Sequence, residues 1–245
     1  MNTGELLEEL RESILRDTST IVAGPQDNLW SDEALMRYMN EAQTLFCRKT
    51  LSLVDQTTAE VTEVALVTDQ TEYPLHDAVL QVLSARVEGQ HQDMVLAGHG
   101  LLDSRPQGPL TDDLTFGDPA AAPYYTDCPT VYTTDEDTMT LRVYPGVSSD
   151  CAGKTLHLRV ARLPISPLSL DDLEGSPEIR DEYHLAMLDW AAYRALSNHD
   201  SDAEGVIRAR GRKKDFEETC KQVLLDMRRR RFAPTAWNFG AGWTK

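Results

Sequence analysis

Hydrophobic residues near the start of the chain recur at the spacing of amphipathic helices. The first, short stripe is made of Leu6, Leu7, Leu10 and Ile14. It ends before Gly24-Pro25, and a longer stripe begins after Ser31, which suits a helix N-cap because Asp32 and Glu33 occupy the first turn. The second stripe is made of Leu35, Tyr38, Met39, Ala42, Leu45 and Phe46. These patterns predict a short first helix and a second helix from about Asp32 to Leu51.

The middle of the chain changes to the two-residue alternation of strands. Segments 61–67 and 79–87 are rich in β-branched residues, and apolar and polar residues alternate over 139–143 and 156–160. These segments predict half-buried antiparallel strands. The acidic run at 135–137 fits a turn after a strand that begins at Val131. Between the strand at 79–87 and the strand that begins at Val131, residues 98–129 are rich in Gly, Pro and Asp without periodicity, which predicts a long loop.

Helical periodicity returns after the strands. Ser176-Pro177-Glu178 has the sequence of a helix start, with Ser as the N-cap and Pro in the first turn. The inner face of that helix would be formed by Ile179, Tyr183, Met187 and Trp190. A turn at 198–202 precedes a last helix that ends near Arg231. Its inner face would be formed by Val206, Ala209, Phe216, Cys220, Val223 and Met227.

Together these elements predict an α+β protein in which the N- and C-terminal helices form one bundle around an inserted antiparallel β lobe. Residues 1–58 and 176–231 would form the bundle, and residues 59–175 the lobe, including the loop 98–129. Residues 232–245 have no helical or strand period and would form an extended C-terminal tail.

The tail carries the strongest functional signal. A basic run, Arg228, Arg229, Arg230 and Arg231, leads into a Gly- and Pro-containing segment with four aromatic residues, Phe232, Trp237, Phe239 and Trp243. Aromatic side chains are costly to leave in water, so such a segment usually rests on its own domain or on another subunit. We predict that these eight residues dock onto a partner.

Charge is distributed unevenly along the chain. The formal net charge is −16, but residues 205–231 contain ten Lys/Arg and four Asp/Glu, which leaves −22 for the remainder. The bulk of the protein should therefore repel nucleic acid, while the last helix could attract phosphate or an acidic partner. A solvated basic face that balances acidic neighbours is the simpler interpretation of such a run.

Motifs for catalysis or cofactors are incomplete, so no catalytic, cofactor or metal residues are predicted. Gly153-Lys154-Thr155 resembles a phosphate loop, but Ser148 stands at the first glycine position and a strand follows where a helix is needed. The calcium-like run from Asp200 lacks its closing carboxylate, because Gly211 is at that position. His91 and His99, near Asp93 and Asp103, could form a zinc pair, but scattered surface histidines are commoner.

The cysteines and the hydropathy of the chain indicate in which compartment the protein is expected. The four cysteines, Cys47, Cys128, Cys151 and Cys220, form no CxxC pair, and the N-terminus lacks the pattern of a signal peptide, so we expect reduced thiols. Cys47 stands beside the basic Arg48 and Lys49, but it also lies next to the apolar stripe, which favours packing. No apolar run approaches the roughly 18 residues that span a bilayer, so no membrane partner is expected.

The order of these segments resembles the head-to-tail adaptor proteins of tailed phages. Residues 29–43, from Leu29-Trp30-Ser31 to Ala42-Gln43, are similar to the second helix of that family. The sheet is suggested by Tyr73-Pro74-Leu75, the strand at Val79, Leu141–Pro145 and Arg162-Leu163-Pro164. Residues 179–192 resemble the long returning helix, and Phe216 stands where the final helix carries an aromatic residue.

The resemblance implies a connector subunit of the virion, made in the host cytoplasm. Such subunits form a ring, usually of about twelve copies, beneath the portal protein. The ring extends the DNA channel and offers a platform to a tail or nozzle protein, so the partners would be portal, tail protein, further copies of the chain and passing double-stranded DNA. An acidic channel wall would let DNA slide, because fixed cations would hold its phosphates.

Two other classes of function remain open from the residues alone. A nucleic-acid-binding module could use the basic last helix to grip phosphates and the aromatic tail to stack on bases. The charge of −22 outside that helix argues against this as the main role. A hydrolase or nucleotide-binding enzyme would need a site that none of the failed motifs supplies.

Overall fold

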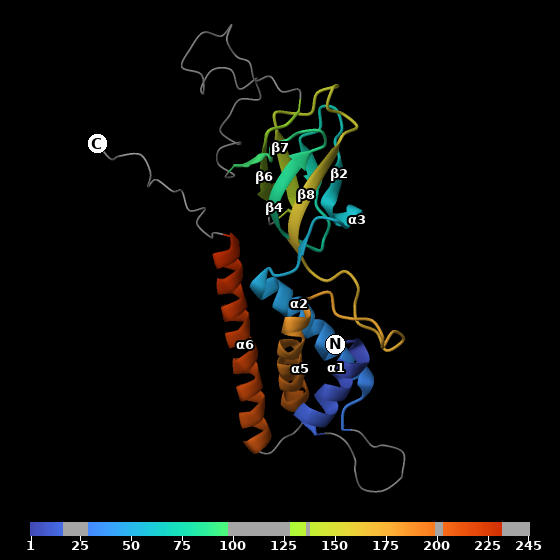
Figure 1. The fold of residues 1–245 in the computed structure, drawn as a ribbon, viewed down its shortest axis with the longest axis vertical. Coiled ribbons are helices and arrows are strands. Elements are labelled where there is room, and N and C mark those ends of the chain that lie inside the picture. The colour runs from blue at the N-terminus through green and yellow to red at the C-terminus, as the bar shows by residue number, and fades with distance from the viewer. Residues whose placement is uncertain (17–28, 98–127, 136–137, 199–202, 232–245) are drawn as a thin grey trace, which may run out of the picture. The chain divides into compact units, whose positions relative to one another are not determined.

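A computed structural model describes residues 1–16, 29–97, 128–135, 138–198 and 203–231 of the protein (Figure 1). The chain is mixed α and β, as predicted, and it divides into two compact units. The helical unit comprises Met1–Ser52 and Pro164–Lys245, and the β lobe comprises Leu53–Leu163.

The helical unit combines segments from both ends of the chain. Its elements are α1 (Thr3–Glu9), the π-helical turn η1 (Leu10–Leu15), α2 (Asp32–Thr50), the 3-10 turn η3 (Asp181–Tyr183), α5 (His184–Asn198) and α6 (Ala203–Arg231). The predicted helix α2 is confirmed, and the Ser31 hydroxyl accepts a hydrogen bond from the Ala34 amide. Aromatic rings join three helices, because the Phe216 ring lies 6.3 Å from that of Phe46 and 5.2 Å from that of Trp190.

The first helical stripe is shifted by the π turn. Leu6 and Leu10 are fully buried as predicted, but the next buried residue is Leu15, whereas Ile14 is only half-buried. A π turn bonds residue i to residue i+5 and so adds one residue to the helical repeat. The three-to-four spacing seen in the sequence therefore points to the wrong residue in this turn.

The helix expected to begin at Ser176 begins at His184, after the 3-10 turn. Arg180 is still extended, with φ −63° and ψ 145°. Glu178 is used elsewhere, because its carboxylate accepts hydrogen bonds of 2.7 Å from the amides of both Ile165 and Ser166. Tertiary hydrogen bonds thus hold 176–180 out of the helix although the local sequence favours a helix start there.

The β lobe contains two four-stranded sheets. In the first sheet, β8 (Thr155–Arg162) pairs with β1 (Val54–Asp55), β2 (Glu63–Ala65) and β4 (Val79–Val87). In the second, the order is β3 (Glu72–Pro74), β7 (Thr140–Tyr144), β6 (Val131–Asp135) and β5 (Val95–Leu96). The predicted strands at 79–87, 139–143 and 156–160 are confirmed, and their pairing is antiparallel.

Two strand predictions need correction. The segment 61–67 is not one strand: a helical turn, α3 (Ala59–Thr62), precedes the short β2. The turn forms because the Asp55 carboxylate accepts hydrogen bonds from the amides of Thr57 and Thr58, which fold the chain back before β2. The pairing is also not wholly antiparallel, since β5 runs parallel to β6.

The lobe contains a disulfide that the sequence analysis did not expect. Cys128, just before β6, is bonded to Cys151, in the turn before β8. Folding brings together two cysteines that are 23 positions apart, a spacing with no recognisable motif. The expectation of four reduced thiols is therefore wrong for this pair, whereas Cys47 and Cys220 are free and buried. Burial raises the pKa of the Cys220 thiol to about 11.

A buried ion pair joins the ends of β1 and β8. The Arg162 guanidinium Nε donates a hydrogen bond of 2.6 Å to Asp55 Oδ2, and the two side chains are 10% and 6% exposed. The Thr58 hydroxyl donates to the same carboxylate. Burial alone would raise the pKa of Asp55, but the hydrogen bonds from Thr58, Thr57 and Arg162 outweigh it and hold this pKa well below its usual range.

The limits of the two units reflect such pairings. The lobe starts at Leu53 because β1 pairs with β8, and it ends at Leu163. The segment after Pro164 belongs to the helical unit: Asn40 on α2 makes two hydrogen bonds with the backbone of Leu168, of 2.8 and 2.9 Å. The sequence pattern had placed these limits at 58/59 and 175/176.

Candidate partner-docking surface

Helix α6 carries the described part of the predicted docking residues. It runs over 29 residues, from Ala203 to Arg231, and lies alongside α5 (Figure 1). Its buried face is formed by Ala209, Phe216, Cys220 and Val223. Four of the six predicted inner positions are therefore confirmed, and their spacing of three, four and seven residues is the helical period.

Polar contacts fix α6 on the helical unit. Arg212 donates a hydrogen bond of 2.7 Å to Asp189 on α5, and the Lys213 ammonium lies 5.4 Å from the centre of the Tyr193 ring. Arg208 donates to the backbone carbonyl of Ile14. Burial raises the pKa of Asp189, an effect that Arg212 opposes. These contacts use the basic side chains of the first half of the helix.

Five other basic side chains in the described part of α6 face solvent. Arg210, Lys214, Lys221, Arg228 and Arg229 are exposed. Arg229 makes one ion pair of 3.4 Å, with Asp226 on the same helix, and both side chains are more than half exposed. Such a pair adds little to stability, so its charge is available to a partner. The exposed end of α6 can therefore attract an acidic surface.

Part of the predicted docking set lies outside the described residues. Arg228 and Arg229 are exposed in the last turns of α6, and Arg230 and Arg231 belong to the same helix. The aromatic residues Phe232, Trp237, Phe239 and Trp243, and the tail 232–245 that contains them, are outside the described part of the chain. The docking role of these eight residues stays a prediction.

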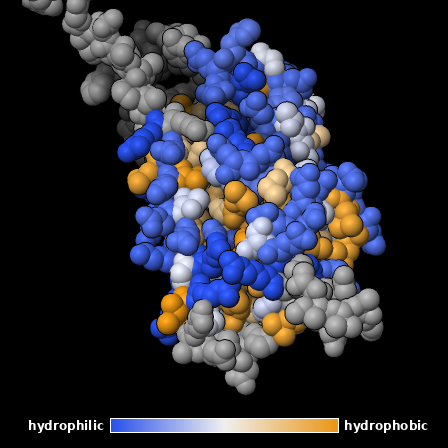
Figure 2. Space-filling model, turned by 60° about the horizontal axis from the view of Figure 1, so that its bottom comes forward, coloured by the Kyte–Doolittle hydropathy of each residue, from blue (hydrophilic) through white to orange (hydrophobic). Residues whose placement is uncertain are grey.

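Exposed apolar side chains on α6 were missed by the sequence analysis. Val206 was expected on the inner face but is 40% exposed, and Ile207 and Leu225 are 69% and 52% exposed. Helical spacing identifies a stripe but cannot tell how far the covering helices extend along it. On the face in Figure 2, hydrophobic residues form separate patches among hydrophilic ones, as is usual for exposed surface.

The motifs rejected in the sequence have other roles in the structure. Gly153 has φ +82° in a turn, and Lys154 Nζ lies 3.5 Å from Cys128 Sγ. Thr155 begins β8, so the predicted strand is confirmed. Gly211 is inside α6, whereas Asp200 to Asp202 lie outside the described residues.

The described residues contain neither a metal-binding cluster nor a membrane-spanning helix. Within them no group of three or more His, Cys, Asp or Glu side chains is placed to hold a metal ion. His99 and Asp103 of the possible zinc pair are outside these residues. Among the described helices none combines the length and apolar character that a bilayer-spanning helix requires.

Comparison with known proteins adds one match. A family model described as SU10 adaptor protein matches residues 1–238 of the chain. No curated protein matches the chain. The match covers the described residues of both units and half of the tail, and it agrees with the resemblance seen in the order of helices and strands.

Proposed function

Because the chain belongs to the SU10 adaptor protein family, a family of phage head-to-tail adaptors, we propose that it forms a ring beneath the portal. Membership makes it a structural component of the virion, and the family is not an enzyme class. The proposal adds that about twelve copies form the ring, which extends the DNA channel and offers the tail or nozzle protein its attachment platform.

The charge of the chain supports a role next to DNA without tight binding. Outside residues 205–231 the chain carries −22, so a ring with this surface on its inner wall would repel phosphates and let DNA pass. Contact with the double strand would be transient and independent of sequence.

The observation that carries the docking part is the exposed basic end of α6. Arg228 and Arg229 extend into solvent at the point where the chain continues into the aromatic tail. We assign Arg228 to Arg231 to the orientation of the subunit against acidic groups of the portal, and the four aromatic residues to affinity.

The energies favour several anchors acting together. An aromatic anchor in a well-packed interface contributes about 2 kcal/mol or more. Fixing the backbone of a tail costs about 1 kcal/mol or more per residue. A single anchor cannot offset that cost, so the four anchors must act together and loss of one aromatic residue should weaken assembly strongly.

The test is a deletion after Arg231 together with charge-reversal variants. The truncated chain should remain a folded subunit of normal melting temperature that no longer assembles on purified portal in electron micrographs. Arg228→Glu/Arg229→Glu should also reduce assembly, whereas the control Arg210→Glu/Lys214→Glu reverses two exposed charges earlier on the same helix and should not. A truncated chain that melts early or aggregates would show that the tail belongs to its own core.

A nucleic-acid-binding role is the second candidate, because the exposed cations of α6 could contact phosphates. A titration of DNA binding against salt separates the two. The adaptor role predicts weak binding that disappears at moderate salt. A DNA affinity that survives at physiological salt and is lost in Arg228→Glu/Arg229→Glu would favour the nucleic-acid module.

A further inference from the structure

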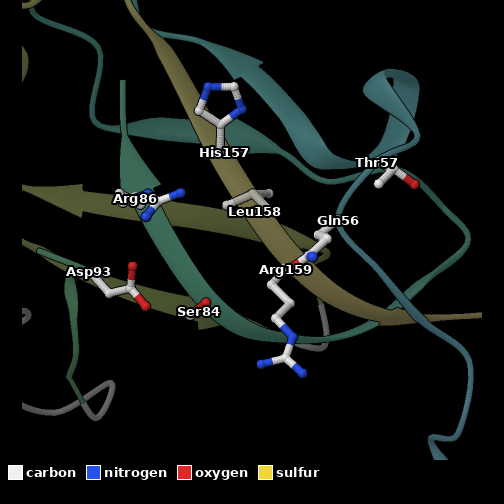
Figure 3. A pocket seen from close by; sticks show the side chains of 8 residues that line it. All are labelled: Gln56, Thr57, Ser84, Arg86, Asp93, His157, Leu158 and Arg159. Carbon is white, nitrogen blue, oxygen red and sulfur yellow. The ribbon is translucent and has the colours of Figure 1, made fainter. Parts of the chain in front are cut away.

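The outer face of the first sheet of the lobe carries a basic hollow. It has a volume of about 470 Å³ and is lined mainly by polar side chains of β4 and β8, among them Ser84, Arg86, His157 and Arg159 (Figure 3). Gln56 and Thr57, which follow β1, and Asp93, which precedes β5, also line it. Hollows of this size accept side chains or small ligands.

Strand register gathers these groups. Arg86 is the pairing partner of His157, and Ser84 is the partner of Arg159, so the four alternate on one face of the β4–β8 pair. The residues between them, Ala85 and Leu158, are buried, and Leu158 also lines the hollow. Neighbouring residues on one face of a strand pair are close enough to contact a single ligand.

The two arginines of the hollow stand out in an acidic lobe. Residues 53–163 contain 17 Asp/Glu and only six Lys/Arg. Arg162 pairs with Asp55, Arg142 pairs with Glu72, and Lys154 lies against Cys128. Arg105 is outside the described residues. Within the described part of the lobe, Arg86 and Arg159 make no ion pair and so remain available to an anion.

The surroundings favour a carboxylate ligand over nucleic acid. His157 already lies 3.8 Å from Glu63, and Asp93 lines the same hollow. These carboxylates and the excess of acidic residues in the lobe would repel a continuous phosphate backbone. A short acidic segment needs only two or three favourable contacts, and arginine forms bidentate hydrogen bonds with carboxylates.

A matching acidic segment is present in the helical unit of the same chain. Asp171, Asp172, Leu173 and Glu174 are all exposed, and the three carboxylates make no ion pair with any described residue. The segment is held in place by backbone hydrogen bonds from Gly4 to the Leu173 carbonyl (3.0 Å) and from Thr3 to the Gly175 carbonyl (2.8 Å). A segment that is already ordered loses little entropy when it binds.

We infer that the basic hollow of one subunit binds the acidic segment 171–174 of a second copy of this chain. The two surfaces are different, so the contact between identical subunits is heterologous. Heterologous contacts produce a ring when the rotation from one subunit to the next closes. This inference rests on the proposed self-association of adaptor subunits, but it uses residues other than the portal-docking end of α6.

Two charge-reversal variants test the contact. The hollow variant is Arg86→Glu/Arg159→Glu, and the segment variant is Asp171→Lys/Asp172→Lys/Glu174→Lys. Each retains one intact half of the contact. At high protein concentration and low salt, sedimentation should show that either variant alone has lost the weak, salt-sensitive association of the wild-type chain. The two variants should associate with each other when mixed, because the intact halves still attract each other and the two reversed halves carry opposite charges as well. A chain that carries all five substitutions should associate again.

Controls separate this contact from portal docking and from DNA binding. Arg210→Glu/Lys214→Glu changes the net charge as much as the hollow variant does and should associate like the wild type. The hollow variant should still bind portal through α6, so loss of portal binding in all variants would count against the proposed function only. Absence of association in the mixture, association unchanged in the hollow variant, or binding of a short DNA duplex that only the hollow variant loses would each overturn the inference.

Discussion

Replacement of Arg162 by Met tests the buried ion pair of the β lobe. Met has similar length and removes the charge, so Asp55 is left as a buried carboxylate without its cation, at 6% exposure. Breaking a buried pair in this way typically costs about 3–5 kcal/mol of the free energy of unfolding. The remaining hydrogen bonds from Thr57 and Thr58 favour the lower end of that range.

The assay must report on the lobe alone, because the two units need not unfold together. Hydrogen exchange of peptides from β4 and β8, measured by mass spectrometry on the full chain, gives the local opening free energy. All four tryptophans lie outside Leu53–Leu163, so tryptophan fluorescence follows the helical unit as an internal control. We expect faster exchange in β4 and β8 and unchanged tryptophan emission.

Arg142→Met is the matched control. Arg142 also pairs with a carboxylate in the lobe, Glu72, but the two side chains are 43% and 56% exposed. An exposed pair contributes only about 0–1 kcal/mol, so this variant should exchange almost as slowly as the wild type. If Arg162→Met and Arg142→Met have the same effect, the buried pair does not hold the lobe together.

The same pair predicts a pH dependence. The pKa of Asp55 is lower in the folded protein than in the unfolded chain, so its stabilising contribution is complete above the unfolded pKa of about 4 and is lost as pH falls toward the folded value. The difference between the wild type and Arg162→Met should therefore narrow as pH falls below about 4, because protonation of Asp55 removes the buried charge that Arg162 pairs with. A difference that is constant over this range would contradict the assignment.

Two further predictions concern the helical unit and the disulfide. Phe216→Ala should destabilise the helical unit by about 3–5 kcal/mol in chemical unfolding followed by tryptophan fluorescence, because the ring is fully buried between Phe46 and Trp190, while exposed Lys221→Ala should change it by less than about 0.5 kcal/mol. Alkylation of the denatured chain without reductant should modify two cysteines, Cys47 and Cys220, and reductant should raise the number to four; four without reductant would mean that Cys128 and Cys151 are not bonded.

Sequence periodicity determined the elements whose signals are local. The apolar stripe and the Ser31 cap located α2, and the alternation of apolar and polar residues located β4, β7 and β8. The stripe of α6 was also identified, since four of its predicted inner residues are buried. In these segments the period, the cap and the burial all agree, so tertiary contacts had little to change.

Tertiary structure decided the features that depend on long-range pairing. The Glu178 carboxylate accepts hydrogen bonds from the amides of Ile165 and Ser166. The helix that the local sequence predicts from Ser176 therefore begins only at His184. The Cys128–Cys151 bond and the ion pair of Asp55 with Arg162 join residues 23 and 107 positions apart. Strand register, which alternation does not specify, sets Arg86 opposite His157 and so creates the basic hollow. Local patterns show which face of an element is apolar, but only the packed chain shows which residues meet across it.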